Sequence, residues 1–424
     1  MKILIIAEWF YPADEIAAVR PTQLYKYWKR AGHLVNVITM NKQFVKPILP
    51  TSEIDDTDIF KMDAKTWLDK YYDKYKLIQP QKMYSKNYKK ESFITRYIKN
   101  MIARRYFAGK QNSWKNNCVK FIQSMDFDYD VVFSSFGPST TLKLGRAIKQ
   151  KHPHVKWIAD FRDQPDRKYH SQIPLFFKSH WIKRLCRKSD LITCVSNGVL
   201  LQTLPKSLKS KASVITNGYD PDMLNGIISN PSSNKLIFAY SGTIYKEDNF
   251  DCFFKVVNEL VSEGKINKDK IAVNYAGRDA RILLEQASRF GFDTIVESYG
   301  LIPKKSALQI QLDAHVLLFV TWNIQKRQGM LKGKIFEQMM MNKPILGFIN
   351  GKVKNSESKE LFDRTGIGFC YEYATNNYDD LKSYVFDLYN QWTSKGKIRY
   401  DRNQDEVDKY NYKNIAAQIL KELK

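Results

Sequence analysis

Short runs of consecutive apolar residues recur along the whole chain, and they constrain its fold more than any other feature. The first run, KILIIA, is followed by a helical segment at residues 21–31, by Gly32 and by a second run at residues 35–39. A continuous apolar run indicates a strand buried on both faces, and the order strand, helix, strand indicates parallel pairing. The sequence therefore predicts an α/β protein with parallel sheets. Further runs lie within residues 128–140, 155–163, 191–198, 213–220, 235–245, 271–279, 296–300, 314–322 and 345–348.

Charged and polar residues follow several of these runs. Asp160, Arg162 and Asp163 end the run VKWIADFRD, and Ser135 ends the run DYDVVFSS. Ligands bind at the carboxyl ends of strands in open parallel sheets, so we expect these residues at one edge of the first sheet. The alternative is an Asp–Arg pair that only braces a loop. Arg20 is either a further cationic group at this edge or a surface residue near a helix end.

The segment GKIFEQMMMNKPILGF, residues 333–348, has the most specific pattern for a bound anion. Gly333 and Lys334 precede a helix that contains Glu337, and an apolar run follows that helix. The free N–H groups and positive dipole end of a helix favour an anion, and the lysine adds charge there. The alternative is that Glu337 is a solvated acid that stabilises its own helix.

This segment resembles the C-terminal domain of retaining glycosyltransferases of family 4, which have two facing Rossmann-like domains in the GT-B arrangement. That family usually has two glutamates eight positions apart. Glu337 matches the second glutamate, and Gly329 stands at the place of the first. The run from Gly333 to Glu337 is similar to a variant branch of the family, as is the Asp-Phe-Arg-Asp run at residues 160–163. Asn217-Gly218 matches the end of the family's first domain.

The sequence departs from the family in two loops that are expected to approach phosphate. Ala17-Ala18 replace a pair of glycines after the first strand, and Gly242-Thr243 stand where a Gly-Arg pair is common. The positive charge for the donor diphosphate must therefore come from elsewhere. The available candidates are Lys246, Arg278, Lys332 and Lys334.

The resemblance implies an enzyme that moves a sugar from a nucleotide-diphosphate donor to a hydroxyl group of a glycan or lipid-linked acceptor, with retention of configuration. It implies a role in bacterial capsule, O-antigen or exopolysaccharide synthesis, with no cofactor and no metal. The departing phosphate helps to take the acceptor proton in such enzymes, so a carboxylate pair is not required. The implied catalytic residues are Asp163, Arg162 and Lys334; the donor-binding residues are Glu337, Gly242, Thr243, Lys246, Arg278, Gly333 and Lys332; the acceptor-side residues are Arg20, Asp160 and Ser135.

Composition along the chain predicts two domains. We expect residues 1–225 to form an N-terminal, acceptor-side Rossmann-like domain, with a basic and aromatic excursion at residues 41–115. Residues 226–234 are rich in Ser, Asn and Pro and form the expected linker. Residues 235–402 form the expected nucleotide-sugar-binding domain. The resemblance implies that a helix within residues 403–424 returns toward the first domain.

The net charge of +24 is concentrated in part in residues 61–110, which hold 14 Lys or Arg against 4 Asp or Glu among many aromatic residues. The apolar residues of 93–107 fall largely on one helical face beside Lys99, Arg104 and Arg105. This pattern suits an anionic membrane surface, although the apolar face could instead pack on the first domain. Nucleic acid is not an expected partner, because no zinc pattern or aromatic RNA-binding motif accompanies the charge.

Cellular location follows from the apolar runs and the cysteines. Every run is shorter than the roughly 18 residues of a membrane span, and Glu8 interrupts the first run, so neither a span nor a signal peptide is expected. The five cysteines show no metal-ligand spacing, which favours reduced thiols and a cytoplasmic protein, peripheral on the inner face of the membrane if its basic segment binds there.

Two other classes of protein stay open. A non-hydrolysing sugar-nucleotide epimerase shares the two-domain architecture, but it needs several carboxylates and a histidine, of which only the cluster at residues 160–163 is evident. A non-catalytic sugar-nucleotide-binding scaffold would explain why Gly329 replaces a glutamate and Thr243 an arginine.

Overall fold

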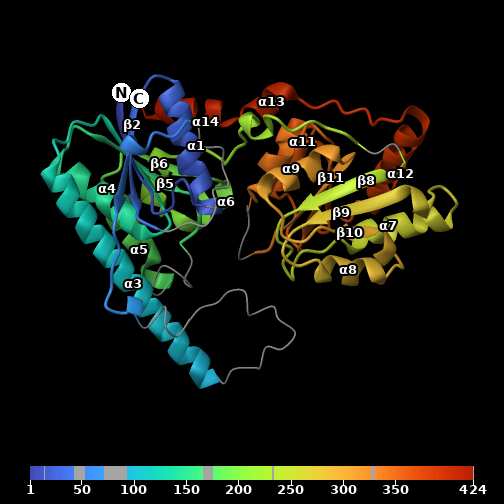
Figure 1. The fold of residues 1–424 in the computed structure, drawn as a ribbon, viewed down its shortest axis with the longest axis horizontal. Coiled ribbons are helices and arrows are strands. Elements are labelled where there is room, and N and C mark those ends of the chain that lie inside the picture. The colour runs from blue at the N-terminus through green and yellow to red at the C-terminus, as the bar shows by residue number, and fades with distance from the viewer. Residues whose placement is uncertain are drawn as a thin grey trace. The chain divides into compact units, whose positions relative to one another are not determined.

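In a computed structural model the chain forms two units, each built on one sheet (Figure 1). The structure describes residues 1–13, 15–42, 53–70, 93–165, 175–231, 234–325, 329 and 331–423. Unit 1 comprises Met1–Cys194, Leu200–Ser213 and Ile419–Lys424, whereas unit 2 comprises Val195–Val199 and Val214–Gln418. The predicted α/β class with two parallel sheets is confirmed. The domain bounds drawn from the sequence stay a prediction.

The sheet of unit 1 has seven strands in the order β3-β2-β1-β4-β5-β6-β7. Pairing is parallel from β3 through β6, and Ile3 of β1 lies opposite Val35 of β2 and Val131 of β4. Ile3 and Ile6 are fully buried, as expected for a central strand covered on both faces. The strands are β1 (Lys2–Ile6), β2 (Leu34–Met40), β3 (Ile59–Met62), β4 (Val131–Ser135), β5 (Lys156–Phe161), β6 (Leu191–Cys194) and β7 (Ala212–Val214).

The first helix begins earlier than predicted. It was expected at residues 21–31, because proline favours the first helical position, but α1 spans Ile16–Arg30 and contains Pro21. The missing N–H of proline costs one hydrogen bond early in the helix. The other helices of this half of the chain are α3 (Phe93–Ser124), α4 (Ser139–Lys151), α5 (Leu175–Cys186) and α6 (Asn197–Thr203), with short 3-10 turns at Asp56–Asp58 and Lys206–Lys211.

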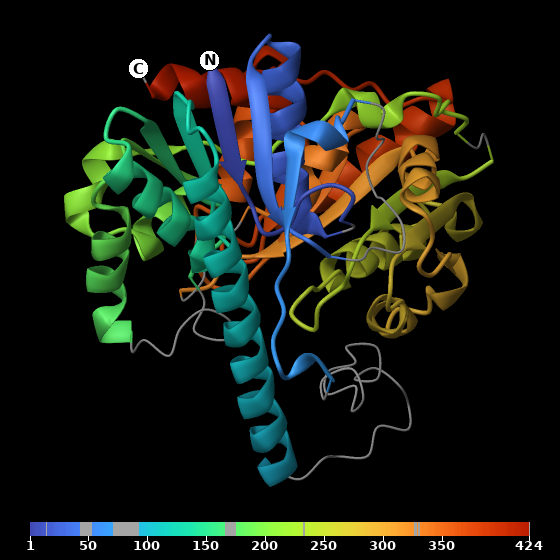
Figure 2. The ribbon, with the colours of Figure 1, turned by 60° about the vertical axis from the view of Figure 1, so that its left-hand side comes forward.

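Helix α3 is 32 residues long, and its amino-terminal part extends past the sheet of unit 1 (Figure 2). Ala103 and Trp114 are buried, whereas Tyr97, Ile98 and Met101 are exposed. Residues 71–92, which hold much of the basic excursion, lie outside the described residues. Among the helices that the structure describes, none is long and apolar enough to cross a membrane.

The sheet of unit 2 has six parallel strands in the order β10-β9-β8-β11-β12-β13. Side chains of β11 alternate between two cores: Leu318 packs in a core with α7, α8 and α12, and Phe319 packs in a core with α9, α10 and α11. The strands are β8 (Leu236–Ser241), β9 (Ile271–Ala276), β10 (Val296–Ser298), β11 (Val316–Trp322), β12 (Ile345–Asn350) and β13 (Gly368–Glu372).

Helices line both faces of this second sheet, as the continuous apolar character of its strands requires. They are α7 (Asp251–Ser262), α8 (Arg281–Ser288), α9 (Lys304–Asp313), α10 (Lys334–Met340), α11 (Glu357–Thr365), α12 (Tyr378–Lys395), α13 (Gln404–Asp408) and α14 (Tyr412–Glu422), with 3-10 turns at Pro221–Leu224, Lys268–Lys270 and Asp293–Ile295. The last residues of α14, from Ile419, belong to unit 1.

Candidate functional site

Two glycines meet at the carboxyl ends of β8 and β9. Gly242 follows β8 with φ +131°, and a Cβ there would lie 3.3 Å from Cε of Lys334. Gly277 follows β9, and a Cβ there would overlap the carbonyl oxygen of Gly242. The Tyr275 hydroxyl donates a 2.9 Å hydrogen bond to the same carbonyl. Glycine is therefore required at both positions, and the backbone after β8 lies directly beside the Lys334 side chain.

Glu337 on α10 lies between two lysines. Its carboxylate accepts a hydrogen bond from Lys334 at 2.8 Å and another from Lys304 at the start of α9, and Gln311 Nε2 donates to it at 3.0 Å. The Glu337 side chain is 16% exposed. Burial alone would raise the pKa of Glu337, but the ammonium groups of Lys334 and Lys304 lower it well below its usual value. Two ammonium groups and one carboxylate leave a net positive charge beside Gly242.

Lys304 was missed by the sequence analysis. Lys304 is far from Glu337 in the sequence, and no motif in its own segment indicates a functional lysine. The available signal was its position, because it begins the helix after β10 at the same carboxyl edge of the sheet.

Lys332 lies two residues before Lys334 but faces another partner. Its ammonium group lies 2.8 Å from the carboxylate of Asp248, which is fully buried. It also lies 4.1 Å from the ring centroid of Trp322 and 5.3 Å from that of Tyr245. Burial raises the pKa of Asp248 despite Lys332, and burial lowers the pKa of Lys332 despite Asp248. Lys332 is thus a neutralised partner of the loop after β8.

The other predicted donor residues lie at the same edge of the sheet. Thr243 and Lys246 are exposed in the loop after β8, and Arg278 is exposed after β9. Gly333 is exposed at the start of α10, where a Cβ would meet no atom within 4 Å. Their contacts with a donor stay a prediction.

Gly329, at the place of the family's first glutamate, has no room for a side chain. Its φ is +67°, and a Cβ would overlap Oε1 of Glu357. Within the same unit, Glu357 accepts hydrogen bonds from the backbone N–H groups of Asn197 at 2.9 Å and Gly198 at 2.5 Å. The carboxylate of Glu357 therefore fills the space that a side chain at residue 329 would need.

In unit 1, three predicted acceptor-side residues form one buried network. Arg20 Nη2 lies 3.0 Å from Oδ1 of Asp160, with 2% and 0% of the two side chains exposed. Ser135 Oγ donates to Asp160 at 3.2 Å, and Thr193, which the sequence analysis did not single out, donates at 2.7 Å. The network joins α1, β4, β5 and β6 beneath the carboxyl edge of the sheet. A direct contact of these residues with an acceptor stays a prediction.

Arg162 and Asp163 lie above this network. Arg162 donates from Nε to the carbonyl oxygen of Phe136 at 2.8 Å and from Nη2 to that of Gly137 at 3.1 Å. Asp163 is exposed, yet the surrounding protein desolvates its carboxylate and raises its pKa, against the opposing charge of Arg162. A carboxylate with a raised pKa can accept a proton more readily than an ordinary aspartate.

A small pocket of about 130 Å³ opens at the same edge of unit 1. Lys42 on its wall lies 2.8 Å from Glu8 and 3.0 Å from the ring centroid of Trp9. Burial lowers the pKa of Lys42, against the charge of Glu8. No pattern in the sequence predicts this pocket. Its lining residues are Phe10, Tyr11, Pro12, Thr39, Met40, Asn41, Lys42 and Lys61.

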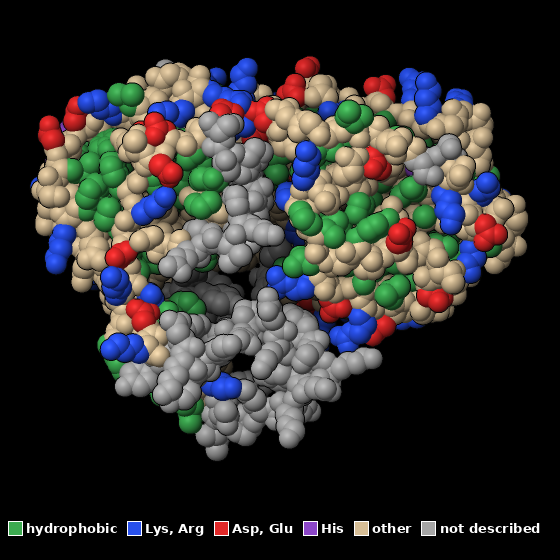
Figure 3. Space-filling model, viewed as in Figure 1, with side chains coloured by type: hydrophobic (Ala, Val, Ile, Leu, Met, Phe, Trp, Pro, Cys, Tyr) green, Lys and Arg blue, Asp and Glu red, His purple; other side chains and the backbone are tan. Residues whose placement is uncertain are grey.

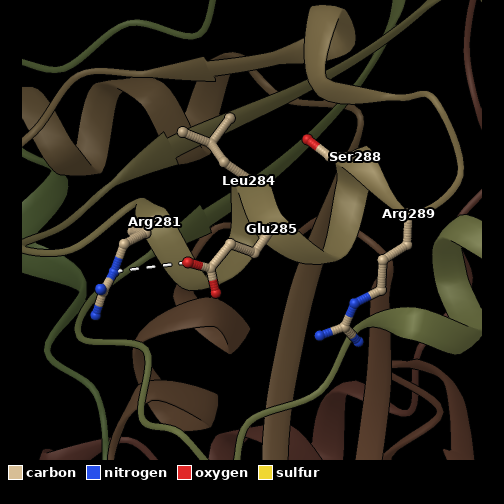
Figure 4. Close-up of a pocket in the computed structure, with 5 residues that line it drawn as sticks. All are labelled: Arg281, Leu284, Glu285, Ser288 and Arg289. Atoms are coloured by element: carbon tan, nitrogen blue, oxygen red, sulfur yellow. Dashed lines mark ion pairs between the residues drawn. The ribbon is translucent and has the colours of Figure 1, made fainter.

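A more open depression lies on α8, away from the strand ends (Figure 4). Arg281 faces Glu285 at 3.8 Å, and Arg289 pairs with Asp251 at 2.8 Å. With these charges balanced on an open helix surface, it has no feature of a reaction site. In the part of the chain that is described, no three His, Cys, Asp or Glu side chains are grouped to hold a metal ion.

The chain resembles solved structures over nearly its whole length at low sequence identity. Sucrose-phosphate synthase from Thermosynechococcus elongatus aligns with a TM-score of 0.59 and 11% identity over 99% of this chain and 97% of that one. An E. coli structure described as trehalose-6-phosphate bound with UDP-2-fluoro glucose aligns with a TM-score of 0.59 and 10% identity over 100% of this chain and 99% of that one. The apo form of the lipopolysaccharide outer core galactosyltransferase WaaB aligns with a TM-score of 0.53 and 11% identity over 100% of this chain and 99% of that one. No protein-family model matches the chain, and no curated protein matches it. The similarities show a GT-B fold.

Proposed function

We propose that this protein is a retaining glycosyltransferase of the family 4 type, which moves a sugar from a nucleoside-diphosphate donor to a hydroxyl group of a glycan or lipid-linked acceptor. The observation that carries the proposal is the group of Glu337, Lys304 and Lys334 beside the bare backbone of Gly242. This group lies at the carboxyl edge of a parallel sheet, where such sheets bind ligands. Its net positive charge suits a diphosphate. Solved structures of the same fold include a galactosyltransferase and a complex with a UDP-glucose analogue.

The donor is held by complementary charge and by hydrogen bonds. The diphosphate lies against Gly242 and the Lys334 ammonium group, which stabilises the charge that develops as the phosphate leaves. Glu337 accepts hydrogen bonds from ribose hydroxyl groups, since its low pKa keeps it ionised. Arg278 and Lys246 are exposed cations at the same edge, and Thr243 and Gly333 offer backbone groups.

The acceptor binds at the carboxyl edge of unit 1. Asp163 orients or deprotonates the acceptor hydroxyl, and Arg162, which bonds only to carbonyl oxygens among its described partners, adds positive charge. Arg20, Asp160 and Ser135 position this edge from below. The departing phosphate helps to remove the acceptor proton, so the reaction proceeds with retention and requires neither a cofactor nor a metal.

The acceptor is a bacterial capsule, O-antigen or exopolysaccharide intermediate at the inner face of the cell membrane. Helix α3 supports this location, because Tyr97, Ile98 and Met101 are exposed on it. Arg104 and Arg105 are exposed one turn further on. Exposed apolar side chains beside arginines suit an anionic membrane surface.

Incubation with a panel of nucleotide sugars tests the proposal. Slow release of the nucleoside diphosphate without acceptor, accelerated by a glycan acceptor, is the expected result. A changed sugar on an intact diphosphate would replace the proposal with an epimerase. Binding with neither reaction would replace it with a sugar-nucleotide-binding scaffold, and absence of any nucleotide binding would overturn all three.

A further inference from the structure

Two aromatic side chains form a right-angled pair near the diphosphate position of unit 2. Tyr245 lies in the loop after β8, and Trp322 ends β11, the strand next to β8. Their ring centroids are 5.8 Å apart and their planes meet at 88°. Tyr245 is 50% exposed, and the neighbouring Ile324 is 40% exposed. Exposed large apolar side chains at the carboxyl edge of such a sheet point to a ligand.

The Tyr245–Trp322 pair is held in place by a buried ion pair. The Lys332 ammonium group pairs with the Asp248 carboxylate and lies over both rings. Asp248 Oδ2 also accepts a 3.0 Å hydrogen bond from the backbone N–H of Tyr245. Gln286 Nε2 in turn donates to the carbonyl oxygen of Asp248 at 2.9 Å. This arrangement fixes the loop after β8 against β11. Because Lys332 and Asp248 neutralise each other, this ion pair adds no net charge beside the Tyr245–Trp322 pair.

Polar atoms near the Tyr245–Trp322 pair are incompletely bonded. Asn323 follows Trp322, and Asn350 lies opposite Trp322 in the sheet register. The side-chain oxygens of Asn323 and Asn350 are buried, and they accept no hydrogen bond from the residues that the structure describes. Unpaired buried acceptors cost free energy, so a donor that reached them after the covering atoms shift would be favoured.

We propose that the Tyr245–Trp322 pair binds the sugar ring of the donor and that it selects a neutral sugar over a uronic acid. The inference rests on the proposed function, which places the donor diphosphate at Gly242 and Lys334. Neighbouring strands are about 5 Å apart, so a sugar on the outer phosphate reaches from the end of β8 to the end of β11. The C–H face of a pyranose packs on the aromatic rings. The neutral Lys332–Asp248 pair offers a sugar carboxylate no net charge.

The test compares a nucleotide sugar with its own nucleoside diphosphate by calorimetry, using the nucleotide that the wild-type protein binds. Trp322→Ala should weaken binding of the nucleotide hexose about tenfold and leave binding of the nucleoside diphosphate within about twofold. Trp322→Phe, which keeps a ring, should lose less. Tyr299→Ala, which removes an aromatic side chain after β10 instead, is the matched control and should change neither affinity.

Several results would overturn the inference. An unchanged ratio of the two affinities in folded Trp322→Ala would exclude contact with the sugar. Equal loss for both ligands would show that Trp322 supports only the diphosphate loop. Tighter binding of the nucleotide uronic acid than of the nucleotide hexose would exclude the stated selectivity. Absence of nucleoside diphosphate binding by the wild-type protein would instead overturn the proposed function, and this inference with it.

Discussion

At the scale of single residues, Glu337 is the side chain on which the proposed donor site depends. We expect Glu337→Ala to weaken nucleoside diphosphate binding by about 1.5–3 kcal/mol, as for hydrogen bonds to a charged acceptor, because ribose hydroxyl groups lose that acceptor. Calorimetry on the variant measures the change, and circular dichroism confirms that the variant is folded. An unchanged affinity in a folded variant would remove Glu337 from the donor site.

Asp163 gives a pH prediction. Its pKa in the folded protein is raised, so its carboxylate is lost as pH falls through that raised value. If Asp163 acts on the acceptor hydroxyl, the acidic limb of the kcat/KM profile lies at higher pH than the ordinary aspartate value of about 3.9. Asp163→Asn should lower turnover and remove this limb. A profile with the limb unchanged in Asp163→Asn would assign it to another group.

The sequence predicts which residues belong to the candidate site better than it predicts which residues they pair with. The motif around Glu337 was recognisable, because its residues are adjacent along one segment. The pairing of Lys304 with Glu337 and that of Asp248 with Lys332 could not be predicted, since each joins residues that are distant in the sequence. Charge counted along a sequence does not show which lysine is already paired.

At the scale of elements, the buried network around Asp160 connects one helix to three strands. Replacing one member of a buried ion pair leaves its partner unpaired, so Asp160→Asn should lower the free energy of unfolding by about 3–5 kcal/mol. Urea denaturation measures this change. Asp126→Asn, an exposed aspartate, serves as the control and should stay within about 0.5 kcal/mol. A small effect of Asp160→Asn would show that Arg20 finds another partner.

The loop before α10 has its own prediction. Gly329→Glu, which introduces the glutamate that is usual at this place in glycosyltransferases of family 4, should destabilise the protein by about 1–2 kcal/mol, because a residue with a Cβ is strained at φ +67° and meets Glu357. Gly333→Ala, at a position with negative φ and open space, should not destabilise it. Thermal unfolding of both variants checks the contrast. A stable Gly329→Glu variant with higher activity would show that the loop can accept the glutamate.

Strands were easier to predict than helix starts. A strand covered on both faces needs an unbroken apolar run, and this requirement is visible in KILII or VLLFVTW without any neighbour. The predicted start of α1 was wrong. Proline is common at the first helical position, so the sequence predicts a start at Pro21, whereas the helix begins at Ile16. The order of strands in each sheet depends on contacts between distant segments.

At the scale of the whole molecule, Lys and Arg side chains are interspersed with acidic side chains on the face shown in Figure 3. We expect the protein to sediment with anionic and not with neutral liposomes, because each Lys or Arg near an anionic surface contributes about 1 kcal/mol. Replacing Lys99, Arg104 and Arg105 with glutamate should abolish sedimentation, and roughly 0.5 M salt should reverse it. Replacing Lys395, Lys397 and Arg399 instead gives the same change in net charge and should have little effect. Equal binding to neutral liposomes, or equal loss in both variants, would exclude α3 as the contact.

The path of the chain through the two units has a consequence for synthesis. The last residues of α14 belong to unit 1, where Ile419 is fully buried and Glu422 accepts a hydrogen bond from Ser213. Residues 1–213 leave the ribosome first, yet their core lacks this helix end until residues 419–423 have been made. The half of the protein that is made first is therefore completed last. A chain truncated after residue 418 would contain all of unit 2 and an incomplete unit 1.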